Sequence, residues 1–340
     1  MSNVFSKQQK AAWELIRADL KYLYTVHLHA EKLGGNYYVA LMPYYALLIK
    51  GAEEWRSSVH RVNPNLVPAP LFNEEQLKFY NLARESIKLW DKPYKTLREM
   101  IREEYEQADR YFSSVCKPIA RVLRLYDVFG VYTANGICCS NTVLGSMYLP
   151  GCHLGNEQYG PYIRDMAYVS GLYVAEFNAL EAYGVNQLML FEDHDYGGLI
   201  KSPVGNVFSD RFVLMTMLCQ INFILQCVDR FVVDEIPAKL RFAYVLYYYI
   251  CKVLPDINRV HGTTFNMDVS LYDDGFRNAM AHYKIGVYLK EDEIITDDLM
   301  FGMTQKAFGL DYLSTKNRVY RELDSLGRQI GKYLKLRNYK

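Results

Sequence analysis

Apolar side chains recur at three- and four-residue steps along most of this chain, and that spacing restricts the fold more than any other feature of the sequence. Near the N-terminus, Trp13, Ile16 and Leu20 would lie on one face of a helix. Ser6 and Gln9 have the spacing of a capping box at the start of that helix. Similar patterns predict further helices over residues 38–55, 73–90, 94–116 (resuming as far as 125), 212–233, 239–254 and 313–336, and a short one from about residue 275. We therefore expect a mainly α-helical protein.

The length and the distribution of glycine suggest how the chain is organised. A chain of 340 residues is long enough for two domains, and half of its residues are apolar, which excludes a mainly disordered state. Eleven of the 21 glycines lie between Gly130 and Gly205, where few helical patterns occur. We expect an N-terminal helical region (1–130), a loop-rich segment (131–205) and a C-terminal helical domain (206–340), for which a helical bundle is the default architecture.

The most hydrophobic stretch, residues 212–228, predicts a buried helix. Gln220, Asn222 and Gln226 interrupt it, and it falls short of the run of about 20 apolar residues that spans a bilayer. Met1 to Phe5 does not begin a secretory signal peptide. Seven cysteines, without the spacing of a small disulfide framework, favour reduced thiols. We expect a cytoplasmic protein that makes no contact with a membrane.

The segment from Asp273 to His282 combines groups that suit chemistry. On a helix, Arg277 and His282 would flank a shallow polar notch, because they are five residues apart. Asn278 would lie one turn before His282, where its amide could orient the imidazole. Asp273 or Asp274 could cap the helix.

Such groups suit cleavage of RNA without a metal ion. A neutral His282 could take the proton from a 2′-hydroxyl, and the freed oxygen would attack the adjacent phosphate and leave a cyclic phosphate. Arg277 could bind two phosphate oxygens and stabilise the charge that develops in the transition state. The leaving 5′-oxygen needs a second proton donor, and a symmetric homodimer would supply one.

The run from Arg277 to His282 resembles the R-polar-x-x-x-H signature of the HEPN superfamily of helical nucleotide-binding and ribonuclease domains. The preceding Asp-Gly-Phe and the following Tyr283 are similar to HEPN proteins of bacterial and phage defence. The resemblance implies a bundle of four or five helices from about Phe208 to the end. It implies a metal-independent endoribonuclease without a cofactor, acting as a dimer in a toxin, abortive-infection or CRISPR-linked role. Arg277 and His282 would be its catalytic residues and Asn278 its polar third residue.

One departure from the family concerns regulation. A HEPN subclass that is paired with a nucleotidyltransferase antitoxin has a tyrosine two residues after the histidine. Lys284 occupies that place here, and Tyr283 comes one residue early. A regulatory or antitoxin partner therefore stays a suggestion of the resemblance, and regulation by modification of that tyrosine is in doubt.

The C-terminal segment could bind an RNA backbone. From Ser314 to Lys340, eight Lys or Arg residues accompany two acidic ones. The alternative is a solvated helix with cations at its favourable C-terminal end. The predicted RNA-binding residues are Lys284, Arg318, Arg321, Arg328 and Lys332.

Two other interpretations of the motif remain open. The domain could be a catalytically silent HEPN module that binds a nucleotide or a partner protein. It could also be a helical scaffold in which Arg277 pairs with Asp273 and His282 is merely solvated. The run Tyr247-Tyr248-Tyr249 could stack on bases, although filling a core or a dimer interface is the commoner role.

We expect no metal site. Cys138-Cys139 and Cys152-His153 contain soft ligands, but adjacent cysteines rarely chelate one zinc ion. The acidic cluster of residues 192–195 fits a solvated turn better than a divalent-ion site. His27 with Glu31 could face one ligand on a helix, although packing is the commoner role for such a pair.

Overall fold

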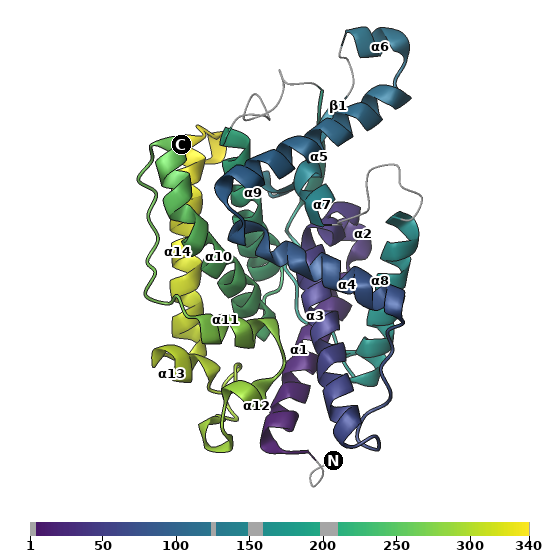
Figure 1. The fold of residues 1–340 in the computed structure, drawn as a ribbon, viewed down its shortest axis with the longest axis vertical. Helices are drawn as coiled ribbons and strands as arrows, with labels where there is room; N and C mark the ends of the chain where they lie inside the picture. The colour runs from purple at the N-terminus through teal and green to yellow at the C-terminus, as the bar shows by residue number, and fades with distance from the viewer. Residues whose placement is uncertain (1–4, 124–126, 149–158, 198–209, 340) are drawn as a thin grey trace.

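The structure, a computed structural model, describes residues 5–123, 127–148, 159–197 and 210–339 and confirms a mainly helical fold (Figure 1). Long helices run along the longest axis of the molecule: α1 (Lys7–Leu28), α3 (Gly35–Val62), α10 (Pro237–His261) and α14 (Tyr312–Tyr333). The predicted capping box of Ser6 and Gln9 begins α1.

The remaining helices lie around these four. They are α2 (Ala30–Leu33), α4 (Glu74–Glu85), α5 (Tyr94–Val115), α6 (Pro118–Val122), α7 (Thr142–Tyr148), α8 (Tyr159–Glu176), α9 (Asp210–Asn222), α11 (Asp274–Ala281), α12 (Ile285–Tyr288) and α13 (Met303–Phe308). Four short or irregular turns complete the list: η1 (Ser86–Asp91), the π-helix η2 (Phe223–Arg230), η3 (Glu291–Glu293) and η4 (Arg337–Tyr339).

The glycine-rich segment forms a small antiparallel sheet of order β2-β1-β3, as well as helices α7 and α8. Strands β1 (Asp127–Ala134) and β2 (Ile137–Asn141) are joined by Asn135-Gly136, and both linking residues have positive φ, as a tight hairpin requires. Strand β3 (Phe191–Gly197) pairs with β1 and carries the acidic cluster. The predicted solvated turn is therefore wrong: the acidic residues lie on an edge strand, where charge discourages pairing with another chain.

Helix α10 is the central helix of the core. Every residue from Pro237 to Ile250 is buried, as expected of a helix surrounded by others. The helix was predicted to end before Pro255 but continues to His261, since burial of Val253, Leu254 and Ile257 offsets the lost hydrogen bond. Helix α3 likewise continues through Pro43 and is longer than predicted.

The predicted buried helix is α9 followed by η2. This stretch, Asp210–Arg230, is the one helix of the described residues that is long and apolar enough to cross a membrane, and 89% of its most apolar part is buried in the fold. Its polar side chains find partners inside: Gln220 bonds to Trp90 and Tyr148, and the amide of Asn222 donates to a backbone carbonyl at 2.8 Å.

The described helices share one hydrophobic core. Buried apolar side chains from α1 to α14 belong to a single cluster, which includes residues of all three predicted segments. The boundaries proposed near residues 130 and 205 therefore do not separate hydrophobic cores in the described chain. The division into an N-terminal helical region, a loop-rich segment and a C-terminal helical domain stays a prediction.

A buried ion pair connects the first helix to the central one. The side chains of Asp19 in α1 and Arg241 in α10 are both fully buried and form a salt bridge. Arg241 also donates to the carbonyl of Met280 at 2.9 and 3.0 Å, and the hydroxyl of Tyr283 donates to Asp19 at 2.7 Å. The guanidinium group of Arg241 thus joins α10 to α1, through Asp19, and to the last turn of α11, through Met280. These contacts fix the end of α11.

We expect Arg241→Met to lower the free energy of unfolding by about 3–5 kcal/mol, because it leaves the Asp19 carboxylate unpaired in the core. The measurement is urea unfolding. Lys252→Met on the same helix is the control, since its 2.7 Å pair with Asp91 is partly exposed and should matter by less than about 1 kcal/mol. Equal losses in the two variants would contradict the anchoring role of Arg241.

Candidate functional site

Helix α11 carries the sequence motif and lies across α10 (Figure 1). The predicted cap is present: the side chain of Asp273 accepts from the backbone N–H of Phe276. Phe276 and Met280 are buried and hold the helix against the core. The helix ends at Ala281, so His282 has extended backbone (φ −141°, ψ 156°) and does not continue the helix.

Tyrosines of α10 hold the segment that leads into α11. The hydroxyl of Tyr244 donates to the carbonyl of Leu271 at 2.8 Å and accepts from the N–H of Asp273 at 3.1 Å. Tyr247 donates to the carbonyl of Asp268, and Tyr248 bonds to the carboxylate of Asp274. The tyrosine run is therefore buried structure, and its hydroxyl groups fix the start of the motif helix.

Arg277 lies over the rings of two of these tyrosines. Its guanidinium carbon is 5.0 Å from the ring centre of Tyr248 and 5.7 Å from that of Tyr249. Stacking of this kind keeps the planar group in place while the charge stays partly accessible. Among the described residues no salt bridge joins Arg277 to Asp273, the pair that the scaffold interpretation proposed, and the side chain of Asp273 caps the helix.

His282 is paired with a carboxylate that sequence reasoning missed. Its Nδ1 lies 3.1 Å from Oε2 of Glu54, in α3, and the His282 side chain keeps 31% of its surface exposed. Asn278 was predicted to orient the imidazole from one turn earlier. That prediction is wrong, since the helix ends before His282 and the ring bonds to Glu54 instead.

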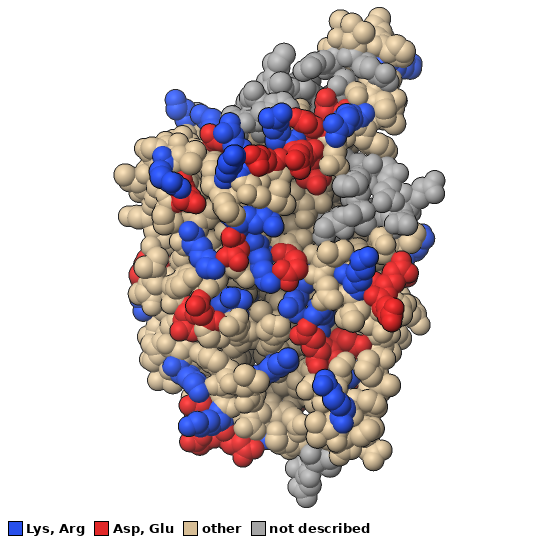
Figure 2. Space-filling model, viewed as in Figure 1, with Lys and Arg blue, Asp and Glu red and all other residues tan. Residues whose placement is uncertain are grey.

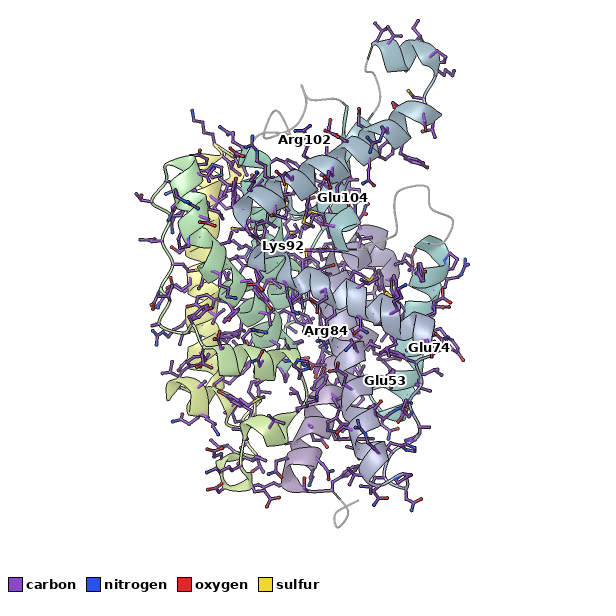
Figure 3. The ribbon with its side chains drawn as sticks, in the orientation of Figure 1. Glu53, Glu74, Arg84, Lys92, Arg102 and Glu104 are labelled. Carbon is purple, nitrogen blue, oxygen red and sulfur yellow. The ribbon has the colours of Figure 1, made fainter. Side chains whose placement is uncertain are left out.

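Glu54 is the centre of a small charged cluster, which we call the Glu54 cluster: Lys50, Glu54, Arg84 and His282. Lys50 and Arg84 both bond to Oε1 of Glu54, Arg84 at 3.3 Å, and Figure 3 shows Arg84 on α4 beside the helix that carries Glu53. Burial raises the pKa of Glu54, but hydrogen bonds from His282 and Lys50 and the charges of Lys50 and Arg84 outweigh it and lower that pKa to about 2. The carboxylate is therefore ionised throughout the physiological range.

Arg277 and the Glu54 cluster are neighbours through Tyr249. The charges of Arg277 and Arg84 both act on the Tyr249 hydroxyl, although burial dominates and raises its pKa to about 12. Arg277 of α11 and Arg84 of α4, which bonds to Glu54, thus both lie within electrostatic reach of Tyr249 in α10. The cations Lys50, Arg84 and Arg277 lie in this part of the molecule together with several carboxylates: Glu54 pairs with Lys50 and Arg84, Asp274 bonds to Tyr248, and Glu85 and Asp91 also act on Tyr249.

The predicted RNA-binding residues are less available than the sequence suggested. Arg318 pairs with Asp268 at 3.3 Å, Arg321 with Glu322 at 3.5 Å and Arg328 with Asp324 at 2.9 Å. Figure 2 shows the described part of one face, where Lys and Arg alternate with Asp and Glu. A stripe of unopposed positive charge along α14 is therefore not formed by these three arginines.

Lys284 and Lys332 are exposed. Lys284 lies two residues after His282, so it is the predicted RNA-binding residue nearest in the chain to the site. It lines a surface hollow with Gln8 and Val59.

The described residues contain no group of three His, Cys, Asp or Glu side chains that could hold a metal ion. Cys152 and His153 lie outside the described residues. His194 and Glu192 stand 3.7 Å apart on strand β3.

No family model, curated protein or solved structure matches this chain. The geometry of the site is therefore the basis for a functional conclusion.

We expect Glu54→Gln to be less stable than the wild type at pH 7, and the difference to shrink as the pH falls from about 4.5 towards 2. The folded-state pKa of Glu54 is about 2, below the usual 4.5, so its contribution is present above 4.5 and is lost as the carboxylate is protonated. Chemical denaturation at several pH values measures this. Glu14→Gln, on an exposed 3.9 Å pair, should differ little from wild type at any pH, and a pH-independent Glu54→Gln loss would contradict the interpretation.

Gly51 is the position in α3 that accommodates Tyr283. A Cβ atom at Gly51 would lie 2.8 Å from Cε2 of that ring, which is buried and bonded to Asp19. Gly51→Ala should therefore cost about 1–3 kcal/mol, despite the better helix propensity of alanine. Gly171→Ala in α8 is the control, since nothing lies within 4 Å of its Cβ position, and it should be neutral or stabilising. A stabilised Gly51→Ala protein would show that the ring can move away.

Proposed function

We propose that this protein is a metal-independent endoribonuclease of the HEPN type, with His282 and Arg277 as its catalytic residues. The observation that carries the proposal is the hydrogen bond between His282 Nδ1 and Glu54, on a histidine whose side chain, like that of Arg277, stays partly exposed. A carboxylate at Nδ1 fixes the imidazole and favours the tautomer in which Nε2 carries the free lone pair. That nitrogen would then take the proton from a 2′-hydroxyl.

The charge around His282 suits a phosphodiester. Lys50 and Arg84 share the Glu54 carboxylate, and Arg277 is held by tyrosine rings. A phosphate that approaches His282 could pair with Arg277, whose guanidinium can bind two of its oxygens. The attacking 2′-oxygen would form the new bond to phosphorus as the bond to the 5′-oxygen breaks, leaving a cyclic phosphate.

The leaving 5′-oxygen needs a proton, and a homodimer is the proposed source. Each protomer contributes one histidine to the motif, so two copies related by a two-fold axis could supply the base and the acid. Exposed Lys284, close to His282 in the chain, would contact the RNA backbone. The same proposal includes a C-terminal HEPN bundle and a cytoplasmic protein. It also includes a role in anti-phage defence or in a toxin system, with a regulatory or antitoxin partner.

A second function is favoured by the three contacts of Glu54. Because Glu54 bonds to Lys50, Arg84 and His282 together, the cluster also resembles a structural ion-pair network. On that interpretation the domain is a catalytically silent HEPN module whose cationic surface binds a nucleotide or a partner protein.

We expect His282→Ala to reduce RNA cleavage in the presence of a chelator by about 10²-fold or more, which is the usual contribution of a general base. Arg277→Ala should lose about as much, and Glu54→Gln less, because Glu54 only positions the ring. Cleavage of a fluorescent single-stranded RNA measures the rates. His194→Ala removes another histidine beside a glutamate and should cleave like wild type.

The outcomes separate the two functions. Chelator-resistant cleavage that His282→Ala abolishes supports the ribonuclease. Intact RNA with the wild-type protein, together with nucleotide binding that Arg277→Ala weakens, supports the silent module. Cleavage that is equal in all variants would come from a contaminant and would overturn the assignment of His282.

A further inference from the structure

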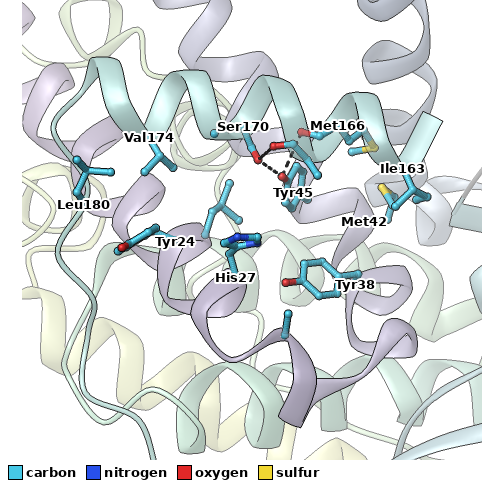
Figure 4. A pocket seen from close by; sticks show the side chains of 14 residues that line it. Tyr24, His27, Tyr38, Met42, Tyr45, Ile163, Met166, Ser170, Val174 and Leu180 are labelled. Atoms are coloured by element: carbon cyan, nitrogen blue, oxygen red, sulfur yellow. Dashed lines mark hydrogen bonds between the residues drawn. The ribbon is translucent and has the colours of Figure 1, made fainter. Parts of the chain in front are cut away.

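A second candidate site lies on another part of the molecule, between α1, α3 and α8 (Figure 4). It is a pocket of about 430 Å³, within the range of small-molecule sites in proteins. The pocket opens to solvent, since His27, Ala167, Gly171 and Leu180 of its lining are exposed.

Small residues on α8 open the pocket. Ala167 and Gly171 are one helical turn apart, both line the pocket and both are exposed. Nothing lies within 4 Å of the Cβ position of Gly171. Larger side chains at these two positions would occupy space that is now open, and the helix would gain stability from losing a glycine. The pocket therefore depends on the small size of Ala167 and Gly171, although the space at Gly171 would accept a larger side chain.

The walls are apolar and adaptable. Leu23, Met42, Met166 and Val174 contribute to them from α1, α3 and α8. Methionine side chains adjust to ligands of different shape. The described lining contains no Lys, Arg, Asp or Glu, so a charged ligand would lose its hydration without gaining an ionic partner.

A few polar groups face this apolar space. The hydroxyl of Tyr45 already donates to Ser170 and to the carbonyl of Met166, as the dashed lines in Figure 4 mark. His27, by contrast, lies at the centre of the view; it is exposed to solvent, and within the described chain its ring forms no hydrogen bond to another residue. Tyr38 lies next to it and makes only a long contact of 3.4 Å to a backbone carbonyl.

We propose that this pocket binds a small, uncharged organic molecule with an apolar body and one hydroxyl or carbonyl group that hydrogen-bonds to His27. The apolar body would replace water against the methionine and leucine side chains. The imidazole can donate to a carbonyl or accept from a hydroxyl without being charged. Two lysines close in sequence to the lining residues have partners elsewhere, since Lys21 pairs with Glu181 and Lys32 donates to the carbonyl of Gln187.

The test uses N-phenyl-1-naphthylamine, an uncharged dye that fluoresces in apolar surroundings, with the full-length protein. Wild type should bind it saturably, at one molecule per chain. Gly171→Phe should weaken binding at least tenfold, because the ring fills the pocket, whereas Gly171→Ala should weaken it much less. Ala175→Phe, one turn further along α8 and outside the pocket, should bind like wild type. Thermal melting confirms that each variant is folded.

A pair of competitors tests the chemistry of the ligand. 1-Decanol should displace the dye from wild type at concentrations at least tenfold lower than decanoate at pH 8, since the two share a chain length and differ in charge. His27→Leu should keep dye binding but reduce the advantage of decanol over decane. Dye binding that Gly171→Phe and Ala175→Phe change equally would overturn the location, and stronger displacement by decanoate would overturn the uncharged ligand.

Discussion

The salt bridge between Asp19 and Arg241 is the interaction on which the rest of the arrangement depends. Burying two opposite charges away from solvent costs free energy, which their mutual attraction and further hydrogen bonds have to offset. Arg241 donates to Oδ2 of Asp19 and to the Met280 carbonyl in the last turn of α11, and Tyr283 donates to the same Oδ2, whereas Oδ1 of Asp19 is buried without a hydrogen-bond partner. His282 lies between Met280 and Tyr283 in the sequence. The hydrogen bonds that stabilise the buried ion pair therefore also fix the chain on both sides of His282.

Much of the helical architecture could be predicted, because apolar spacing and caps act locally. The capping box of α1 and the Asp273 cap of α11 are examples. The sheet was missed although Asn135-Gly136, a strong hairpin signal, stands between two runs rich in β-branched and apolar residues. The end predicted for α10 before Pro255 is wrong because proline removes a helical hydrogen bond locally, but burial of the surrounding apolar side chains outweighs that loss.

In the candidate site, too, local features could be predicted and long-range contacts could not. The chemical groups of Arg277 and His282 could be identified from their spacing, whereas Glu54 could not, since it is 228 residues away from His282 in the chain. Within α3, Lys50 and Glu54 have only the spacing of an ordinary surface pair. The pairings of Arg318 and Arg328 also escaped prediction, because a count of charges does not say which ones neutralise each other.

The contact between Gly51 and Tyr283 has a consequence for how such a chain can change over time. A side chain at position 51 is accommodated without strain if the ring at position 283 becomes smaller, but a smaller residue there would take the hydroxyl group away from Asp19. Drift at any of these three places would then require compensating replacements at the others. The trio should vary together among descendants of this fold, or not at all.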